Sequence, residues 1–360
     1  MIERTRIVNH PGIYIKEAIE ELGLNQSEFA LRSGLSIKNV STLISGESNI
    51  TFEVAQKLSS FFNNSVEGWI NLQTKYDLYK AAEEKECEYE EDWLIAKQFD
   101  KDFMNDCLKI HIDPKNKEET IDQLRRRFCV GSLAALKQNN MYVFYKTSVS
   151  KDIDEKTIIM RNAWVSLAEQ RARQMGCQTF NKDKLLDNIK YLKSLTLEDP
   201  EVFQPKLIDC LAKCGIKLII LPFLPHSNVT GVTKWLPNDS GVMIAVNDCG
   251  KDADKIWFAI FHEIGHAIKN HKRHLTISYK KGEIETDEEK EANEFAKNSF
   301  IDPQDYKEFV ENRDFRIGSI KAFAKKQNIA SFMVIGRLQK EGLLPWTAFQ
   351  DYKVKYNVIL

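Results

Sequence analysis

The chain has 360 residues and a formal net charge of −1, with 51 lysines and arginines against 52 aspartates and glutamates. This balance excludes a general electrostatic attraction to nucleic acid or to anionic membranes. We expect no membrane span, because no apolar run reaches the roughly 20 residues that cross a bilayer, and no signal peptide, because no apolar stretch follows the charged first residues. The seven cysteines are scattered and odd in number, which favours free thiols and a cytoplasmic protein.

The N-terminal stretch 25–46 has the pattern of a helix, a tight turn and a second helix. Asn25 is placed to cap the first helix, and Glu28 completes a capping box. Gly34 permits the left-handed backbone that such a turn requires. Ser36 is placed to cap the second helix, so this stretch predicts a helix-turn-helix.

The outer face of the second helix is polar and is expected to lie in the major groove of DNA. Residues 1–79 nevertheless hold 7 Lys and Arg against 9 Asp and Glu, a net charge of −2. Because phosphate neutralisation supplies most non-specific affinity, DNA contacts must be local, and we expect a dimer on two half-sites. The alternative is a helical bundle that serves for protein interaction. The candidates for DNA contact are Gln26, Arg32, Ser36, Lys38, Asn39, Ser41 and Thr42.

Further helices are expected to begin at His10-Pro11-Gly12 and after Thr51. With the helix-turn-helix, the stretch from His10 to about Leu78 resembles the XRE-type domain of addiction-module antitoxins, the HigA-like group. The resemblance implies an all-α DNA-binding domain, assigned to 1–79, with operator DNA and a cognate toxin as partners.

Residues 80–150 are expected to form a helical, charged connector. Its acidic part, 81–92, is predicted to be solvated. The three consecutive arginines at 125–127 are interpreted as a surface turn of a helix, with contact to phosphate or to an acidic partner as the alternative.

Residues 261–266 contain the pattern His-Glu-x-x-His in an apolar run that predicts a buried helix, with Asp252 as its N-cap. His262 and His266 are four residues apart, so both imidazoles lie on one helix face and can bind one metal ion. Glu263 is placed to hold a metal-bound water as a general base. This is the signature of a zinc-dependent hydrolase; the alternative is two histidines satisfied in a core.

Catalytic zinc needs a third protein ligand, with water in the fourth position. His271 and His274 follow the motif, but the third-ligand position of the metzincin pattern holds Lys272. On the next, acidic helix, Glu289 and Asn293 fall on one stripe. We therefore predict Glu289 as the third ligand and Asn293 as a hydrogen-bond partner of a ligand.

The segment from Cys214-Gly215-Ile216 to the Glu-x-Glu-Ala-Asn pattern at 289–293 resembles the ImmA/IrrE family of metallopeptidases. The resemblance extends over about 160–342, and the family's zinc ligands correspond to His262, His266 and Glu289. The family's Leu-x-Pro appears here one residue longer, at 300–303, which leaves Glu291 open as an alternative to Glu289. The resemblance implies an α+β zincin-like peptidase domain with a small sheet, assigned to 151–360.

The expected chemistry is attack of zinc-bound hydroxide on a peptide carbonyl, with Glu263 as the general base. We expect the strand at 242–246 to pair with the substrate as an added strand. The candidate donors to the oxyanion are His271, His274 and Tyr279. A helix pair at 320–338 is expected to pack in the peptidase core.

The overall prediction is a mainly α protein, α+β in total, that joins a DNA-binding regulator to a Zn²⁺ endopeptidase. As stand-alone members of the resembled family do, the peptidase is expected to cleave a regulatory protein, such as a repressor or an antitoxin. Whether it is active or latent is left open. The alternative is an addiction-module antitoxin or repressor whose metal site is structural or sensory.

Overall fold

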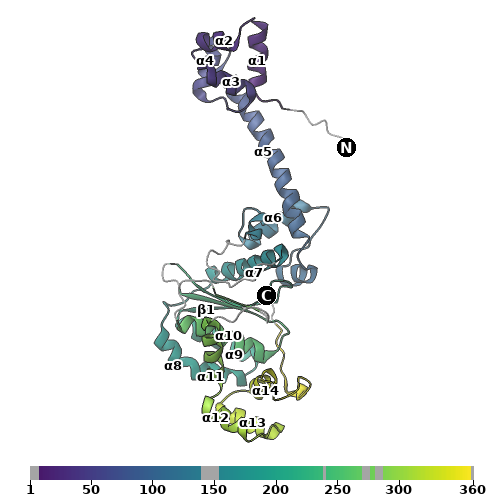
Figure 1. Ribbon diagram of the computed structural model, residues 1–360, viewed down its shortest axis with the longest axis vertical. Coiled ribbons are helices and arrows are strands. Elements are labelled where there is room, and N and C mark those ends of the chain that lie inside the picture. The colour runs from purple at the N-terminus through teal and green to yellow at the C-terminus, as the bar shows by residue number, and fades with distance from the viewer. Residues whose placement is uncertain (1–7, 139–153, 238–240, 270–275, 280–286, 358–360) are drawn as a thin grey trace. The chain divides into compact units, whose positions relative to one another are not determined.

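The computed structural model describes residues 8–138, 154–237, 241–269, 276–279 and 287–357 (Figure 1). The chain divides into two compact units, Met1–Glu91 and Asp92–Leu360, and the long helix α5 (Val66–Ala96) passes from the first into the second. None of the described helices is both long and apolar enough to span a membrane.

Unit 1 is all-helical and forms the predicted helix-turn-helix. Asn25 Oδ1 accepts a hydrogen bond from the Glu28 backbone N–H at 2.9 Å, and Ser36 Oγ accepts one from the Asn39 N–H at 3.1 Å. Gly34 lies in the left-handed region at φ 71°, where glycine is unstrained. The helices are α1 (Gly12–Glu21), α2 (Gln26–Ser33), α3 (Ile37–Ser45), α4 (Phe52–Phe62) and the first part of α5, and they enclose a core that includes Ile15, Phe29, Val40, Leu43, Ala55 and Leu58.

Unit 2 contains a four-stranded mixed sheet in the order β1-β3-β2-β4. Strand β3 pairs in parallel with β1 and antiparallel with β2, and β4 pairs antiparallel with β2. The prediction that the strand at 242–246 pairs with substrate is wrong, because both edges of β3 are already hydrogen-bonded to neighbouring strands. The strands are β1 (Ile216–Leu221), β2 (Val229–Trp235), β3 (Val242–Asn247) and β4 (Thr276–Tyr279).

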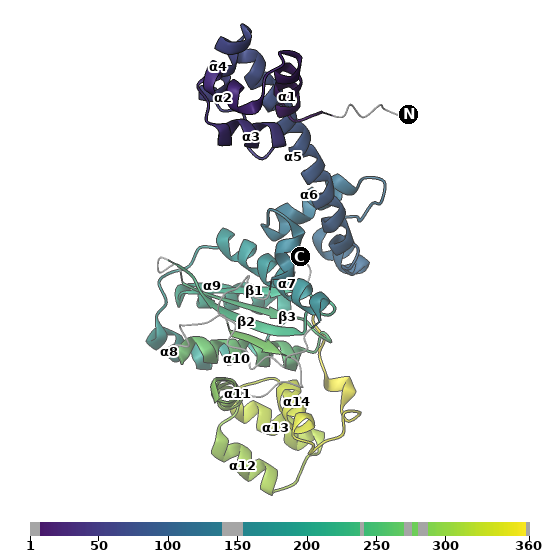
Figure 2. The same ribbon diagram turned by 45° about the horizontal axis from the view of Figure 1, so that its top comes forward.

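Helices cover both faces of this sheet. Helix α7 (Glu155–Gln174) lies on one face and α10 (Ala253–Ile268) on the other, with α11 to α14 beyond α10 (Figures 1 and 2). The pair α13 and α14 contributes Ile320, Phe323 and Val334 to the core, as predicted. The other α-helices are α6 (Lys117–Phe128), α8 (Lys182–Ser194), α9 (Pro200–Lys213), α11 (Asp287–Phe300), α12 (Pro303–Glu311), α13 (Ile317–Gln327) and α14 (Ser331–Lys340). A short π-helix lies at Phe103–Leu108, and short 3-10 helices lie at Leu133–Lys137, Leu195–Leu197 and Gln350–Tyr352. The predicted fold class, mainly α with a small sheet, is confirmed.

The end of the acidic stretch is not solvated as predicted. Asp92 is fully buried and accepts hydrogen bonds from Arg125 Nε at 2.7 Å, Ser132 Oγ at 2.8 Å and the Leu133 N–H at 2.8 Å. The arginine turn is therefore only partly a surface feature, since Arg125 is held by Asp92 and Arg127 Nη2 donates to the Leu108 carbonyl at 3.1 Å. A buried carboxylate needs such partners, because its desolvation is otherwise too costly.

Candidate metal centre and nucleic-acid interface

Helix α10 is buried over most of its length, and tertiary contacts determine both its start and its docking. Asp252 occupies the N-cap position, but its side chain does not cap the helix as predicted; it pairs with Lys255 Nζ at 2.5 Å. The Ala253 N–H instead donates to the Val354 carbonyl at 2.9 Å, so the C-terminal segment satisfies this helix end. Gly265 lets α11 approach closely, since a Cβ there would lie 3.1 Å from Ala292 Cα.

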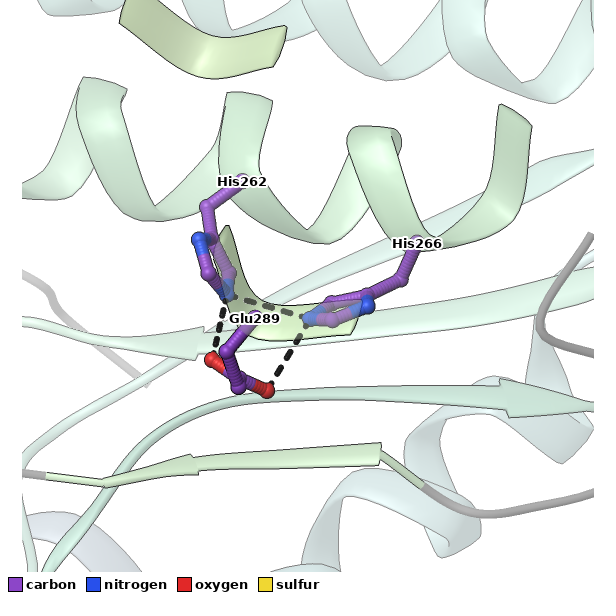
Figure 3. A group of neighbouring side chains, drawn as sticks. All are labelled: His262, His266 and Glu289. Atoms are coloured by element: carbon purple, nitrogen blue, oxygen red, sulfur yellow. Dashed lines mark hydrogen bonds and ion pairs between the residues drawn. The ribbon is translucent and has the colours of Figure 1, made fainter. Parts of the chain in front are cut away.

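Two imidazoles project from one side of α10 toward a carboxylate on α11 (Figure 3). His262 Nε2 lies 3.2 Å from Glu289 Oε2, His266 Nε2 lies 3.3 Å from Glu289 Oε1, and the two Nε2 atoms are 3.1 Å apart. Tetrahedral zinc with bonds of about 2.0–2.1 Å has ligand atoms about 3.3 Å apart along each edge. The two imidazole nitrogens therefore have the spacing of two corners of a zinc tetrahedron, and Glu289 places one carboxylate oxygen beside each of them.

Asn293 lies one turn beyond Glu289 on α11 and contacts the far side of the His262 ring. Its Oδ1 is 3.1 Å from His262 Nδ1. The amide oxygen can only accept, so this contact places the ring proton on Nδ1 and leaves the Nε2 lone pair directed at Glu289 and His266. That tautomer is the one a metal ligand requires.

The charges of the site suit a cation. Burial, the largest influence, opposes charge on both His262 and Glu289, but their mutual contacts outweigh it. With no metal bound, contacts with His262 and His266 lower the pKa of Glu289 to about 2, and Glu289 and Glu263 raise the pKa of His262, so the metal-free site favours a protonated His262 ring, whose Nε2 proton a metal ion would displace. Glu289 is thus a carboxylate at any pH of interest.

The alternative third ligand points elsewhere. Glu291 Oε2 pairs with Lys269 Nζ at 3.2 Å, and its side chain is 50% exposed against 23% for Glu289. The candidate oxyanion donors His271 and His274 lie outside the described residues, as does the side chain of Tyr279. The structure thus brings together His262, His266, Glu289 and Asn293, and places Glu291 at the surface.

Glu263 is fully buried and turned toward strand β2. Thr233 Oγ1 donates to Glu263 Oε2 at 2.6 Å, and Gly231 lies against the same carboxylate. Sequence reasoning missed both residues. The available signal was their spacing, because residues two apart on a strand face the same side, but nothing in the sequence paired β2 with α10.

The predicted DNA-contact residues gather on α2 and α3 of unit 1. Gln26, Lys38, Asn39 and Ser41 are exposed. Three others are exposed or half-buried but already bonded within the unit. Arg32 pairs with Glu28, Ser36 caps α3, and the Thr42 hydroxyl donates to the Lys38 or Asn39 carbonyl and accepts from Ser48 Oγ.

Comparison with known proteins supports both parts of this description. The helix-turn-helix family matches residues 15–69, and the family described as IrrE N-terminal-like domain, a peptidase family, matches residues 212–325. Virulence-associated protein A′ of Dichelobacter nodosus is 37% identical over 83 residues, which cover 23% of this chain and 72% of that protein. The uncharacterized HTH-type transcriptional regulator YddM of Escherichia coli is 35% identical over 78 residues, 21% of this chain and 83% of that protein.

Among solved structures, an addiction module antidote protein of the HigA family from Coxiella burnetii is 26% identical, with a TM-score of 0.23. The match covers 24% of this chain and 95% of that chain. Both family resemblances inferred from the sequence are confirmed. The chain belongs to the helix-turn-helix regulators and carries, in addition, an IrrE N-terminal-like peptidase domain.

Proposed function

We propose that this chain is an antitoxin-like transcriptional regulator whose peptidase domain is a zinc endopeptidase that cleaves a regulatory protein, such as a repressor or an antitoxin. The observation that supports the enzymatic part is the convergence of two imidazoles and one carboxylate: His262 Nε2 and His266 Nε2 lie 3.1 Å apart, and each lies 3.2–3.3 Å from a different oxygen of Glu289. The two rings come from α10 and the carboxylate from α11, and one ligand atom from each residue lies within 4.8 Å of the others, as a shared metal ion requires.

In this proposal His262, His266 and Glu289 hold zinc, and Asn293 orients the His262 ring. Zinc, when bound, polarises the scissile carbonyl and makes a water acidic enough to lose its proton near neutral pH. Glu263 would accept that proton on a carboxylate oxygen while the water oxygen bonds to the scissile carbonyl carbon, and would return it to the leaving amine as the peptide C–N bond breaks. Burial of His266 and Glu263, both 0% exposed, keeps bulk water from competing for these groups.

Unit 1 supplies the proposed contact with operator DNA. Lys38, Asn39 and Ser41 are exposed on α3, the second helix of the helix-turn-helix, where side chains can reach base edges in a major groove. The net charge of −2 over residues 1–79 means that few phosphates are neutralised, so we propose a dimer on two half-sites. We propose a cytoplasmic location, as the proposed contact with operator DNA requires, and a cognate toxin as a further partner.

The decisive experiment compares wild type with Glu263→Gln in cells. Newly created protein N-termini are catalogued by mass spectrometry, and metal content is measured on both purified proteins. We expect equal zinc in both, and N-termini that appear with wild type and disappear with Glu263→Gln or with a chelator. The surface variant Glu291→Gln is the matched control and is expected to behave as wild type. A Glu263→Gln protein that still cleaves would refute the assigned base.

A structural or sensory metal is the second candidate function. The observation that favours it is the same burial: His266 and Glu263 have no exposed surface. In that case zinc would bind but no new N-termini would appear, and zinc would instead change the affinity for promoter DNA. A gel shift with and without chelator measures this, and co-purification tests the toxin partner.

A further inference from the structure

Two residues of strand β2 contact the carboxylate of Glu263. The strand runs beside α10, and its residues Gly231 and Thr233 both face this one side chain. Neither residue contributes a donor atom to the group formed by His262, His266 and Glu289. We therefore expect these two residues to affect the position of the Glu263 carboxylate and not the three proposed metal ligands.

Thr233 fixes one oxygen of the carboxylate. Its Oγ1 donates to Glu263 Oε2 at 2.6 Å and lies 3.1 Å from the Glu263 backbone oxygen, and the residue is only 2% exposed. A hydrogen bond to an ionised acceptor at this distance belongs to the strong class. Because threonine is β-branched, a strand backbone restricts its χ1, and the hydroxyl direction is set by the sheet.

Gly231 makes room for the other oxygen. A Cβ at this position would lie 2.3 Å from Glu263 Oε1, 2.8 Å from its Cδ and 2.9 Å from its Cγ. The backbone of Gly231 is not in the left-handed region, so its conformation does not call for glycine. Space for the carboxylate is the reason that remains.

We propose that Gly231 and Thr233 are positioning residues that hold the Glu263 carboxylate in the orientation it needs as a general base. This inference rests on the proposed zinc peptidase function. It requires that Thr233 act through Glu263, so that removing the hydroxyl has no further consequence once the carboxylate is gone.

The test uses the full-length, zinc-loaded protein with acetohydroxamic acid as the probe. A hydroxamate binds zinc through its oxygens and offers a proton to a neighbouring carboxylate. We expect Thr233→Val to weaken hydroxamate binding about tenfold, measured by calorimetry, while zinc affinity from chelator competition stays within twofold. Thr233→Ser keeps the hydroxyl and is expected to restore binding to within threefold. Thr196→Val is the control for the substitution itself, because Thr196 is a buried threonine whose hydroxyl donates to the Lys193 carbonyl and accepts the Ala330 N–H, and does not contact Glu263.

A double-mutant cycle tests the route of the effect. Thr233→Val added to Glu263→Gln is expected to change hydroxamate binding no further. Thr233→Val alone should lower kcat and leave KM unchanged on any substrate found by N-terminal mapping. If Thr233→Val does not fold, Gly231→Ala serves in its place. It is expected to weaken hydroxamate binding by a similar factor in the wild-type protein and to have no effect on that binding in Glu263→Gln.

Three outcomes overturn the inference. Wild-type binding by Thr233→Val, or an effect that adds to that of Glu263→Gln, defeats it while leaving the zinc peptidase intact. A wild-type protein that takes up no zinc defeats the proposed function and the inference with it.

Discussion

Asn293 offers the sharpest test of how the metal centre is built, because it touches a proposed ligand without being one. Asn293→Ala removes the 3.1 Å contact between Oδ1 and His262 Nδ1. His262 is buried, so water cannot easily replace the lost acceptor, and the ring is free to rotate or to change tautomer. Loss of such an outer partner typically costs 10- to 100-fold in metal affinity, which is about 1.4–2.7 kcal/mol.

Zinc affinity is measured by competition with a chromophoric chelator at fixed pH. The control is Asn298→Ala, because Asn298 is an exposed asparagine on the same helix and its removal reports any effect of the substitution on α11 itself. We expect a loss of about tenfold or more for Asn293→Ala and none for Asn298→Ala. Equal zinc affinities for Asn293→Ala and wild type would refute the reasoning that Asn293 orients the His262 ring. Equal losses of zinc affinity in both variants would show that the substitutions act by perturbing α11 and not through the His262 ring.

Three further predictions concern pH, packing and DNA. Burial, the largest influence, lowers the pKa of His10 from 6.5, and its Nδ1 accepts the Gly12 N–H at 3.0 Å, so the folded form is neutral. The unfolded chain takes up a proton below about pH 6.5, so stability is fully present above that pH and falls below it, by at most about 1.4 kcal/mol per pH unit. Urea unfolding across this range should show a pH dependence that His10→Asn reduces; an unchanged dependence contradicts it. Asp92→Ala removes the carboxylate that pairs with the largely buried Arg125 guanidinium and should lower the free energy of unfolding by about 3–5 kcal/mol, whereas a loss below about 1 kcal/mol in denaturant titration would show that the pair is unimportant. Lys38→Ala should weaken binding to promoter DNA and lower the salt slope by about 1 per subunit, measured by fluorescence anisotropy; an unaltered slope would exclude a phosphate contact.

Local chemistry in the sequence was sufficient for much of the fold. The caps at Asn25 and Ser36 and the turn at Gly34 each depend on neighbours within a few residues. The shared face of His262 and His266 follows in the same way from the helix repeat. These features could be predicted because helix geometry relates residues three or four apart whatever the rest of the chain does.

Only the tertiary structure decided the contacts between distant segments. The sequence left Glu289 and Glu291 open as partners of the histidines, and the close docking of α11 on α10 at Gly265 places Glu289 beside them. The burial of Asp92 against Arg125 and the hydrogen bond from Thr233 to Glu263 are likewise contacts between distant segments that the sequence did not predict. Periodicity states which face a side chain occupies, but not which other element covers that face, because this depends on packing of the whole unit.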